Sequence, residues 1–357
     1  MRIKSIRAYL KNLALTKPYT IAYQTTSDVE NVFLEVELEN GMVGLGAANP
    51  SPDVVGESPE QALQNLQGEW VSGLVAKDIR LFIALIRDAQ KQFPDAPGTL
   101  AALDIALHDA FGQFMGVPIV QFYGQKIYSM PTSVTIGIMN VADTLSEAAG
   151  YYAQGFRVLK VKTGLDVAED IERILKLRET YRSNLIIRVD ANQGYSLDDL
   201  NRFCQATATS NVELIEQPMP VGREAELREL PSEIRIRLAA DESLKDPKAA
   251  LQLAQQPQPF GIYNIKLMKC GGIRAALDMA TIAEPAGISL FWGCNDESRV
   301  SITAALHSAF ACPNTRYIDL DGSFDLAEDI VSGGFVLENG RMRPSAGSGL
   351  GLARQSS

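Results

Sequence analysis

Charged residues recur at a nearly constant interval through the second half of the chain, each at the end of a short apolar segment. Asp190 ends LIIRVD, Glu216 ends VELIE, Asp241 follows IRLAA, and Lys266 follows YNI, at intervals of 26, 25 and 25 residues. One strand, one loop and one helix together span about this length, so the interval is typical of a parallel βα repeat. In an eight-stranded barrel, residues at the carboxyl ends of successive strands meet at one mouth. The repeat therefore predicts a barrel with a charged centre.

Two lysines precede this series in the segment FRVLKVK. Lys160 and Lys162 are two residues apart, and because side chains of a strand alternate between faces, both point the same way. Adjacent like charges disfavour protonation, which predicts a lowered lysine pKa and an amine able to act as a base. Together with Lys266, these lysines flank the three carboxylates from both sides.

The segments between residues 123 and 322 alternate between short apolar strands and helical patterns. The strands are expected in eight segments: MPTSVTIGI, FRVLKVK, LIIRVDANQ, VELIEQP, IRLAADES, YNIKLMK, ISLFWGCND and RYIDLDG. Strand count and connection lengths favour an α/β protein with a closed TIM-type (β/α)7β barrel.

Residues 1–122 have a different pattern, which predicts a separate α+β domain. Alternating strands with a hairpin turn at 39–41 come first, and the polar segments 17–31 and 49–57 are expected to be loops. Ser58, followed by Pro59 and by Gln61, predicts a capped helix start. The tail, 323–357, contains a hairpin signal at 338–340 and is expected to return to the N-terminal domain.

Composition excludes several classes of function. The formal charge of −10 and the absence of basic runs argue against a nucleic-acid partner. The N-terminal segment lacks the apolar core of a signal peptide, and no apolar run is long enough to span a bilayer, so we expect a soluble, cytoplasmic protein without a membrane partner. The four cysteines form no CxxC pair, and both histidines fall in predicted helices, which leaves proton chemistry to lysines and carboxylates.

Three carboxylates at one barrel mouth suit a hard divalent cation such as Mg²⁺. The alternative is that Asp190, Glu216 and Asp241 cap the following helices, which is a common role for acids after barrel strands. Three such acids bracketed by lysines favour the metal, and better cap candidates, Ser196 and Asp246, lie further along the chain.

The lysines of the second and sixth strands would lie on roughly opposite sides of the mouth. A carboxylate substrate bound to the metal would then have a base on each face of its α-carbon. Removing the α-proton creates an enediolate, whose charge a cation can neutralise. One lysine would take the proton and the other would return one to the opposite face, which inverts the centre.

Five motifs resemble the muconate-lactonising branch of the enolase superfamily, over essentially the whole chain. They are KVK at 160–162, DANQ at 190–193, EQP at 216–218, ADES at 240–243 and NIKLMKCGG at 264–272. The resemblance implies that Lys162 and Lys266 are the acid/base pair and that Lys160 assists electrostatically. It implies that Asp190, Glu216 and Asp241 bind Mg²⁺. The N-terminal domain would be a capping domain, closed by the C-terminal tail, with substrate lid loops around 18–30 and 50–57.

Two further acids narrow the reaction within this branch. Asp319 and Asp321 in YIDLDG share one face of the last strand, and such an anionic pair fits an ammonium group. The pair is similar to the motif with which dipeptide epimerases hold the amino terminus of the substrate. The alternative is that both are turn and cap acids before Gly322. The resemblance thus implies a dipeptide substrate, with Thr135 of the first barrel strand as a further substrate contact.

Substrate preference is expected to differ from that of the L-Ala-D/L-Glu epimerases of the family. There an arginine in the first lid loop meets the glutamate side chain, whereas this chain has Gln24 near that place. Asp296, beside Glu297, would favour a cationic side chain on the dipeptide. An N-acylamino-acid racemase, a cycloisomerase and a non-catalytic binding protein remain alternatives, and a homo-oligomer is expected.

Overall fold

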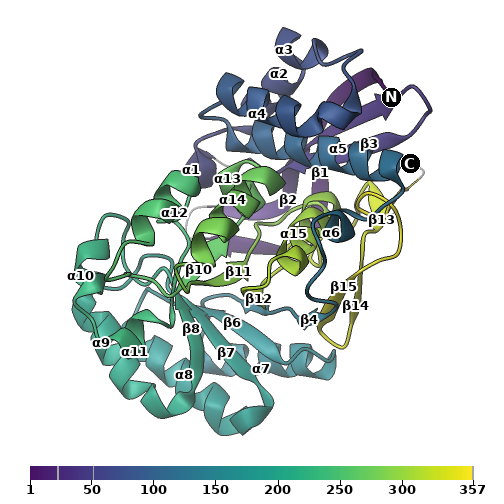
Figure 1. The fold of residues 1–357 in the computed structure, drawn as a ribbon. Helices are drawn as coiled ribbons and strands as arrows, with labels where there is room; N and C mark the ends of the chain where they lie inside the picture. The colour runs from purple at the N-terminus through teal and green to yellow at the C-terminus, as the bar shows by residue number, and fades with distance from the viewer. Residues whose placement is uncertain (22–23, 51, 356–357) are drawn as a thin grey trace.

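The computed structural model describes residues 1–21, 24–50 and 52–355, and of residues 17–21, 24–26, 53 and 54 it describes the backbone only. An N-terminal unit of three strands and several helices lies against a second unit built around a parallel sheet (Figure 1). Within the described residues, no helix is both long and apolar enough to cross a membrane.

Eight strands form one curled parallel sheet in which each strand pairs with its neighbours in sequence. They are β5 (Val134–Ile136), β6 (Val158–Lys162), β7 (Ile186–Asp190), β8 (Val212–Glu216), β9 (Leu238–Ala240), β10 (Ile262–Ile265), β11 (Ser289–Trp292) and β12 (Thr315–Ile318). A parallel bridge between Thr132, two residues before β5, and Ile318 of β12 links the two edges of this sheet. The predicted barrel is confirmed.

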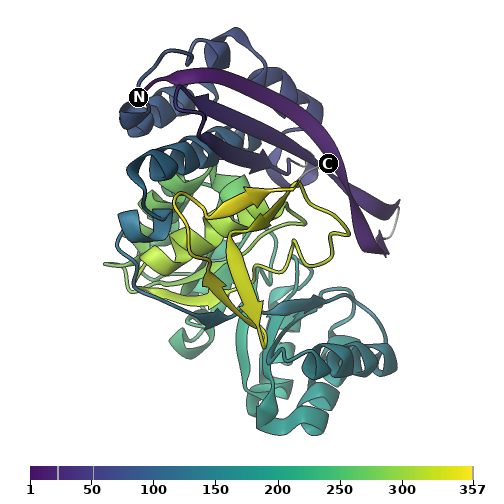
Figure 2. The same ribbon diagram turned by 90° about the vertical axis from the view of Figure 1, so that its right-hand side faces the viewer.

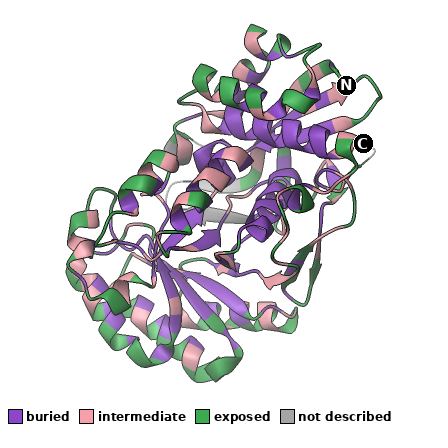
Figure 3. Cartoon of the chain, in the orientation of Figure 1, coloured by how far each residue is buried: buried purple, intermediate pink, exposed green. Residues whose placement is uncertain are grey.

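Seven helical connections separate the eight strands, which gives the expected (β/α)7β order. They contain α7 (Val141–Ala153), α8 (Val167–Tyr181), α9 (Leu197–Ala206), α10 (Glu224–Arg228) with α11 (Ser232–Arg235), α12 (Pro247–Leu253), α13 (Leu267–Cys270) with α14 (Ile273–Ala283), and α15 (Arg299–Ala311). The strands are buried, and the outward faces of the helices are exposed (Figure 3). Ser196 and Asp246 cap α9 and α12 as predicted.

The capping domain packs a three-stranded antiparallel sheet on a long buried helix. Its elements are β1 (Ile3–Ile21), β2 (Gln24–Leu38), β3 (Val43–Ala48), α1 (Pro52–Val55), α2 (Pro59–Leu66), α3 (Glu69–Ser72), α4 (Phe82–Gln92), α5 (Pro97–Met115) and α6 (Ile119–Phe122). Ser58 and Gln61 form the predicted capping box of α2. A Cβ atom on Gly46 would lie 1.9 Å from the carbonyl oxygen of Ala102, so only glycine lets β3 approach α5 this closely.

The prediction of a loop over residues 17–31 is wrong for most of the segment. The described part is strand, and the ends of β1 and β2 pair with each other, with Tyr19 opposite Thr26 and Thr20 opposite Thr25. Threonine, tyrosine and isoleucine favour extended backbone, and here this preference outweighs the polar composition from which the loop was inferred. Figure 2 shows the two strands as a long curved ribbon that extends beyond the rest of the capping domain.

The C-terminal tail contributes β13 (Val331–Gly333), β14 (Phe335–Glu338), β15 (Arg341–Pro344) and β16 (Leu352–Arg354). The hairpin predicted at 338–340 joins β14 to β15, with positive φ angles at Asn339 and Gly340, and β15 pairs with β4 (Met130–Pro131). The tail also returns to the capping domain. The amide of Thr16 donates to the carbonyl of Asp325 at 2.7 Å, and that of Ile119 to the carbonyl of Gly349 at 2.9 Å.

Candidate active site

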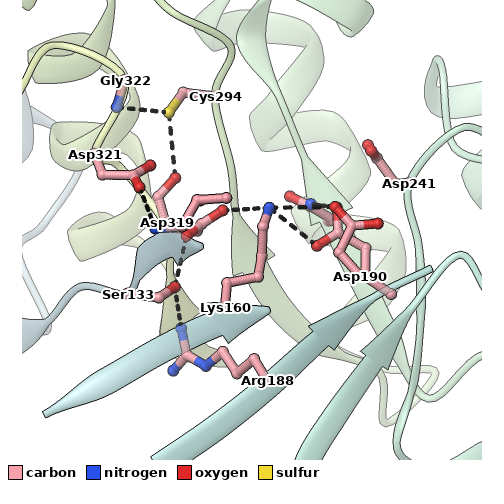
Figure 4. A network of polar contacts seen from close by, with 12 residues as sticks. Ser133, Lys160, Arg188, Asp190, Asp241, Cys294, Asp319, Asp321 and Gly322 are labelled. Atoms are coloured by element: carbon pink, nitrogen blue, oxygen red, sulfur yellow. Dashed lines mark hydrogen bonds and ion pairs between the residues drawn. The ribbon is translucent and has the colours of Figure 1, made fainter. Parts of the chain in front are cut away.

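Lys160 lies at the centre of the charged groups that β6, β7, β8 and the end of β12 bring together. Its side chain is buried, and its Nζ atom is 2.6 Å from Asp319 Oδ2, 3.3 Å from Glu216 Oε2 and 3.5 Å from Asp190 Oδ2 (Figure 4). One ammonium group is therefore shared by two acids of the predicted metal set and one acid of the predicted amine-binding pair. The sequence had predicted that it lies on the same face as Lys162, and this is confirmed, because both contact Asp190.

The prediction that a neighbouring ammonium lowers the pKa of Lys160 is wrong. Burial alone would lower this pKa, but the carboxylates of Asp319, Glu216 and Asp190 raise it well above its usual value. The pKa of Lys266 is likewise raised, because attraction to Asp241 and Glu216 outweighs the effect of burial. The charges that decide the balance come from other strands, so they are not adjacent in the sequence.

The two predicted acid/base lysines lie four strands apart in the barrel. Lys162 ends β6, and its Nζ atom is 2.8 Å from Asp190 Oδ2 and 2.9 Å from Asn192 Oδ1. Lys266 follows β10, and its Nζ atom is 2.9 Å from Asp241 Oδ2. In an eight-stranded barrel, strands four positions apart face each other across the axis. The two amines thus approach the carboxylates from opposite sides.

A third lysine of this group was not predicted from the sequence. Lys269 in α13 is buried and forms an ion pair with Asp241 Oδ1, and it donates to the carbonyl of Asn264 at 3.2 Å. Lys266 and Lys269 are three residues apart at a helical turn, which is the spacing that brings side chains to one face. That spacing in NIKLMKCGG was the available signal.

Asp190, Glu216 and Asp241 are all buried and supply oxygen atoms of the kind that a divalent cation prefers. Glu216 Oε1 accepts from Asn264 Nδ2 at 2.7 Å, whereas Oε2 has no hydrogen-bond partner and only the ion pair with Lys160. Burial and the Asp190 carboxylate raise the pKa of Glu216 to about 8. An unpartnered carboxylate oxygen beside two other acids fits a cation at this place.

As the side chains stand in the described residues, no three His, Cys, Asp or Glu side chains are grouped so as to hold a metal ion. The reason is visible in the contacts, since Asp190 is turned to Lys162 and Asp241 to Lys266 and Lys269. Burial opposes ionisation of Asp241, but these two ammonium groups lower its pKa far below the usual value. The three acids therefore supply the oxygen ligands that a cation needs. In this structure, however, lysines hold two of them, Asp190 and Asp241.

The alternative role of these acids as helix caps has no support in the structure. The helices that follow β7 and β9 are capped by Ser196 and Asp246, and α10, which follows β8, has Arg223 at its N-cap position and no side-chain cap. Backbone φ angles are positive at Asn192, Gln193 and Gln217, directly after the metal candidates, which is a conformation that such residues adopt at constrained functional sites. Gln217 also accepts from the amide of Asp241 at 3.0 Å, so it ties neighbouring strand ends together.

Asp319 and Asp321 lie beside this group, at the end of β12. Asp319 Oδ1 accepts from Ser133 Oγ at 2.6 Å, and Asp321 Oδ2 accepts from the backbone amide of Thr135 at 2.8 Å. Burial would raise the pKa of Asp319, but Lys160 holds it below the usual value, whereas burial and the Asp319 charge raise the pKa of Asp321 to about 7. The structure thus joins the aspartate pair to Thr135, which the sequence had also selected.

Of the two predicted specificity residues, Gln24 and Asp296, the structure describes the side chain of Asp296 only. Gln24 begins β2, but its side chain lies outside the described part of the chain. Asp296 is half-buried between β11 and α15, next to the buried Glu297, whose Oε1 accepts from the amide of Asn295 at 2.8 Å. Burial raises the pKa of Glu297 to about 7. This segment follows a barrel strand at the end where the active site lies.

Comparison with known families matches both parts of the fold. Residues 143–355 match a family described as "Enolase C-terminal domain-like", and residues 5–124 match "Mandelate racemase / muconate lactonizing enzyme, N-terminal domain". The chain belongs to the enolase superfamily. The two matches cover the barrel and the N-terminal domain, in agreement with the resemblance that the five sequence motifs had indicated.

Within the enolase superfamily, the chain is similar to several characterised enzymes. It is 51% identical to an L-Lys-D/L-Arg epimerase of Desulforapulum autotrophicum, over 99% of this chain and all of the relative. A dipeptide epimerase of Methylococcus capsulatus, in complex with Mg and the dipeptide L-Arg-D-Lys, has a TM-score of 0.96 at 49% identity and covers 99% of this chain and 100% of that chain. An L-Ala-D/L-Glu epimerase of Bacillus subtilis is 30% identical over 98% of this chain and 97% of the relative.

Proposed function

We propose that the protein is a Mg²⁺-dependent dipeptide epimerase that prefers dipeptides with cationic side chains. The observation that carries this proposal is the position of Lys162 and Lys266, which reach a buried set of carboxylates from strands four apart, beside a second acidic pair. Inverting a carbon centre by proton transfer requires a base on one face and an acid on the other.

Lys162 and Lys266 exchange roles with the direction of the reaction. One takes the proton from the α-carbon that lies next to the substrate carboxylate, and the other delivers a proton to the opposite face. Lys160, held among Asp319, Glu216 and Asp190, stays charged and lowers the energy of negative charge nearby. Three carboxylates surround its buried ammonium group, whereas the ion pair of Lys266 is with Asp241, and this difference favours an electrostatic role for Lys160.

Asp190, Glu216 and Asp241 would hold Mg²⁺, whose charge favours the negative charge that develops on the substrate carboxylate as the α-proton leaves. The Oε2 atom of Glu216, which has an ion pair with Lys160 but no hydrogen-bond partner, supports this assignment. So do relatives, since the Methylococcus capsulatus enzyme and a dipeptide epimerase of Enterococcus faecalis were each crystallised with Mg and a dipeptide.

Asp319 and Asp321 bind the amino terminus of the dipeptide, with Thr135 fixing the orientation of Asp321. An ammonium group pairs well with two carboxylates in a buried place, whereas an N-acyl group cannot donate to both. This pair therefore favours a dipeptide over an N-acylated amino acid, although a relative of Bacillus cereus at 30% identity is an N-succinyl-L-Arg/Lys racemase.

The preference for cationic side chains is supported by two kinds of observation. Asp296 and Glu297 place acidic groups in the segment after β11. The two L-Lys-D/L-Arg epimerases, at 51% and 49% identity, are far more similar to this chain than the L-Ala-D/L-Glu epimerases, at 30% to 32%. We assign Asp296 to contact with the substrate side chain, and Gln24 to the lid in place of an arginine.

The test is a library of dipeptides followed by proton NMR in deuterium oxide. With Mg²⁺ present, the α-proton signal of a Lys- or Arg-containing dipeptide should disappear as the opposite epimer accumulates. N-Succinyl-lysine and an Ala-Glu dipeptide serve as comparisons. Faster exchange of the N-succinyl compound would favour a racemase, preference for Ala-Glu would remove the cationic assignment, and no exchange of any substrate would favour a binding protein.

Two general expectations from the sequence remain predictions. A homo-oligomer would elute from size exclusion with a light-scattering mass that is a multiple of 38.9 kDa. A cytoplasmic location would be tested by fractionating cells that produce the natural protein.

A further inference from the structure

An arginine is buried in the barrel directly below the active site. Arg188 of β7 is 2% exposed, and its Nε atom donates to Glu213 Oε2 at 2.7 Å. One terminal nitrogen donates to the carbonyl of Ile318 at 2.8 Å and to Ser133 Oγ at 3.1 Å. The guanidinium thus reaches from β7 to the place where the first and last strands meet.

Ser133 links Arg188 to the active site by a second hydrogen bond. Its Oγ atom is 2.6 Å from Asp319 Oδ1 and 3.4 Å from the carbonyl oxygen of Ile318. A hydroxyl group has one proton, and the short contact to a carboxylate is the stronger of the two. Ser133 therefore accepts from Arg188 and donates to Asp319, so the hydrogen bonds run in one direction (Figure 4).

The same carboxylate is held on its other side by Lys160, at 2.6 Å from Oδ2. Both oxygens of Asp319 thus have a fixed partner, one below the site and one within it. Asp321 differs, since its Oδ2 atom accepts from a backbone amide. The lowered pKa of Asp319 and the raised pKa of Asp321 agree with this difference in partners.

Arg188 needs none of this for its own hydrogen bonding. Glu213 and the carbonyl of Ile318 already accept from it, and its guanidinium lies over the rings of Phe291 and Tyr317, at 5.4 and 5.1 Å from their centroids. The contact with Ser133 is the one that leads to Asp319, the carboxylate to which binding of the substrate's amino group is assigned.

We propose that Arg188 and Ser133 are positioning residues for amine recognition, which act by fixing the carboxylate of Asp319 from below. This inference rests on the proposed function, because it gives Asp319 the role of binding the amino terminus of a dipeptide. Neither residue touches the substrate. Their removal should weaken recognition of the amine and spare the rest of the binding site.

The experiment compares two inert ligands that differ only at the amino terminus. L-Lys linked to α-aminoisobutyrate has no α-proton to lose, and its N-acetyl form lacks the ammonium group. Each is measured as a competitive inhibitor of the Mg²⁺-loaded, full-length protein. Wild-type protein should bind the free amine much more tightly than the acetylated form.

In Ser133→Ala, binding of the free amine should weaken about tenfold, which is typical of one lost hydrogen bond to a charged group. Binding of the acetylated form should change less than about twofold, and KM for a substrate dipeptide should rise about tenfold with kcat nearly unchanged. Ser308→Ala is the matched control, since it removes another buried serine hydroxyl, which donates to the carbonyl of Ala304. It should alter neither ligand.

Arg188→Met should give the same pattern, and if it does not fold, Ser133→Ala decides the question alone. Equal weakening of both ligands, or no change in either, would overturn the positioning role. If wild-type protein itself does not distinguish the free amine from the acetylated form, the proposed function fails, and this inference fails with it.

Discussion

Replacing each acid/base lysine by methionine separates the two half-reactions. In Lys266→Met, Lys162 can still remove the α-proton from the epimer whose proton points toward β6, but nothing returns a proton from the other side. In Lys162→Met, the opposite epimer is affected. Epimerisation should therefore stop in both variants, while exchange with solvent persists for one epimer in each, because each amine serves one face.

The contacts of each lysine determine the size of these effects. A general acid or base contributes about 10² to 10⁴ in rate, so epimerisation should fall by about that factor. Stability should change little. When Lys266 is removed, Asp241 still has its ion pair with Lys269. When Lys162 is removed, Asp190 still has its ion pair with Lys160, at 3.5 Å. The Lys162 side chain is 30% exposed, so water partly screens its ion pair with Asp190.

The assay follows the α-proton of each epimer separately by NMR in deuterium oxide, and compares both variants with Lys176→Met. Lys176 is an ion-paired lysine on the outer helix α8, far from the barrel mouth, and its removal should leave activity unchanged. Two results would refute the two-base reasoning: full epimerisation by either variant, or solvent exchange of the same epimer by both.

Two further predictions concern pH. Because the pKa of Asp321 is raised to about 7, this carboxyl should lose its charge as the pH falls below 7, so KM for dipeptides should rise more steeply between pH 8 and 6 in wild type than in Asp321→Asn. His307 in α15 is buried, and burial lowers its pKa from 6.5 to about 4. The unfolded chain therefore binds this proton more tightly, and the stability that neutral His307 allows is complete above pH 6.5 and lost as the pH falls toward 4. Denaturant unfolding at pH 7 and pH 5 should show a loss of about 2 kcal/mol from this group alone, and His307→Leu should lack that part of the loss. An equal acid sensitivity of wild type and variant would contradict it.

Much of the active site could be predicted because its residues occupy equivalent places in a repeating unit. Asp190, Glu216 and Asp241 each lie at the carboxyl end of a barrel strand. Because these ends meet at one mouth of the barrel, residues that recur at a regular interval in the sequence lie close together in the structure. The barrel follows from the same repeat. The separate N-terminal domain was predicted from its change of sequence pattern. The ends of β1 and β2 were not predicted as strands, because their polar composition is typical of a loop, and the pairing between the two strands that makes them extended is not visible in the sequence.

The residues that the prediction missed are those whose partners come from elsewhere in the chain. Arg188 is two residues before Asp190, so the alternation of a strand puts both on the inner face, yet nothing nearby in the sequence indicates that it reaches Ser133 and the carbonyl of Ile318. The charge state of Lys160 is a similar case. Its neighbour Lys162 is adjacent in sequence, but Asp319, which does most to raise its pKa, is 159 residues away.

The position of Lys160 also explains why one fold can keep its proton chemistry while its substrate changes. Through Asp190 and Glu216 it contacts the carboxylates assigned to the metal, and through Asp319 it contacts the carboxylate assigned to the amino terminus. The reacting groups and the amine site are thus held in one fixed geometry by a single buried charge. Side-chain preference is assigned instead to the segment that contains Asp296 and to the lid of β1 and β2. Substitutions there should alter which dipeptide is accepted without disturbing the lysines to which proton transfer is assigned.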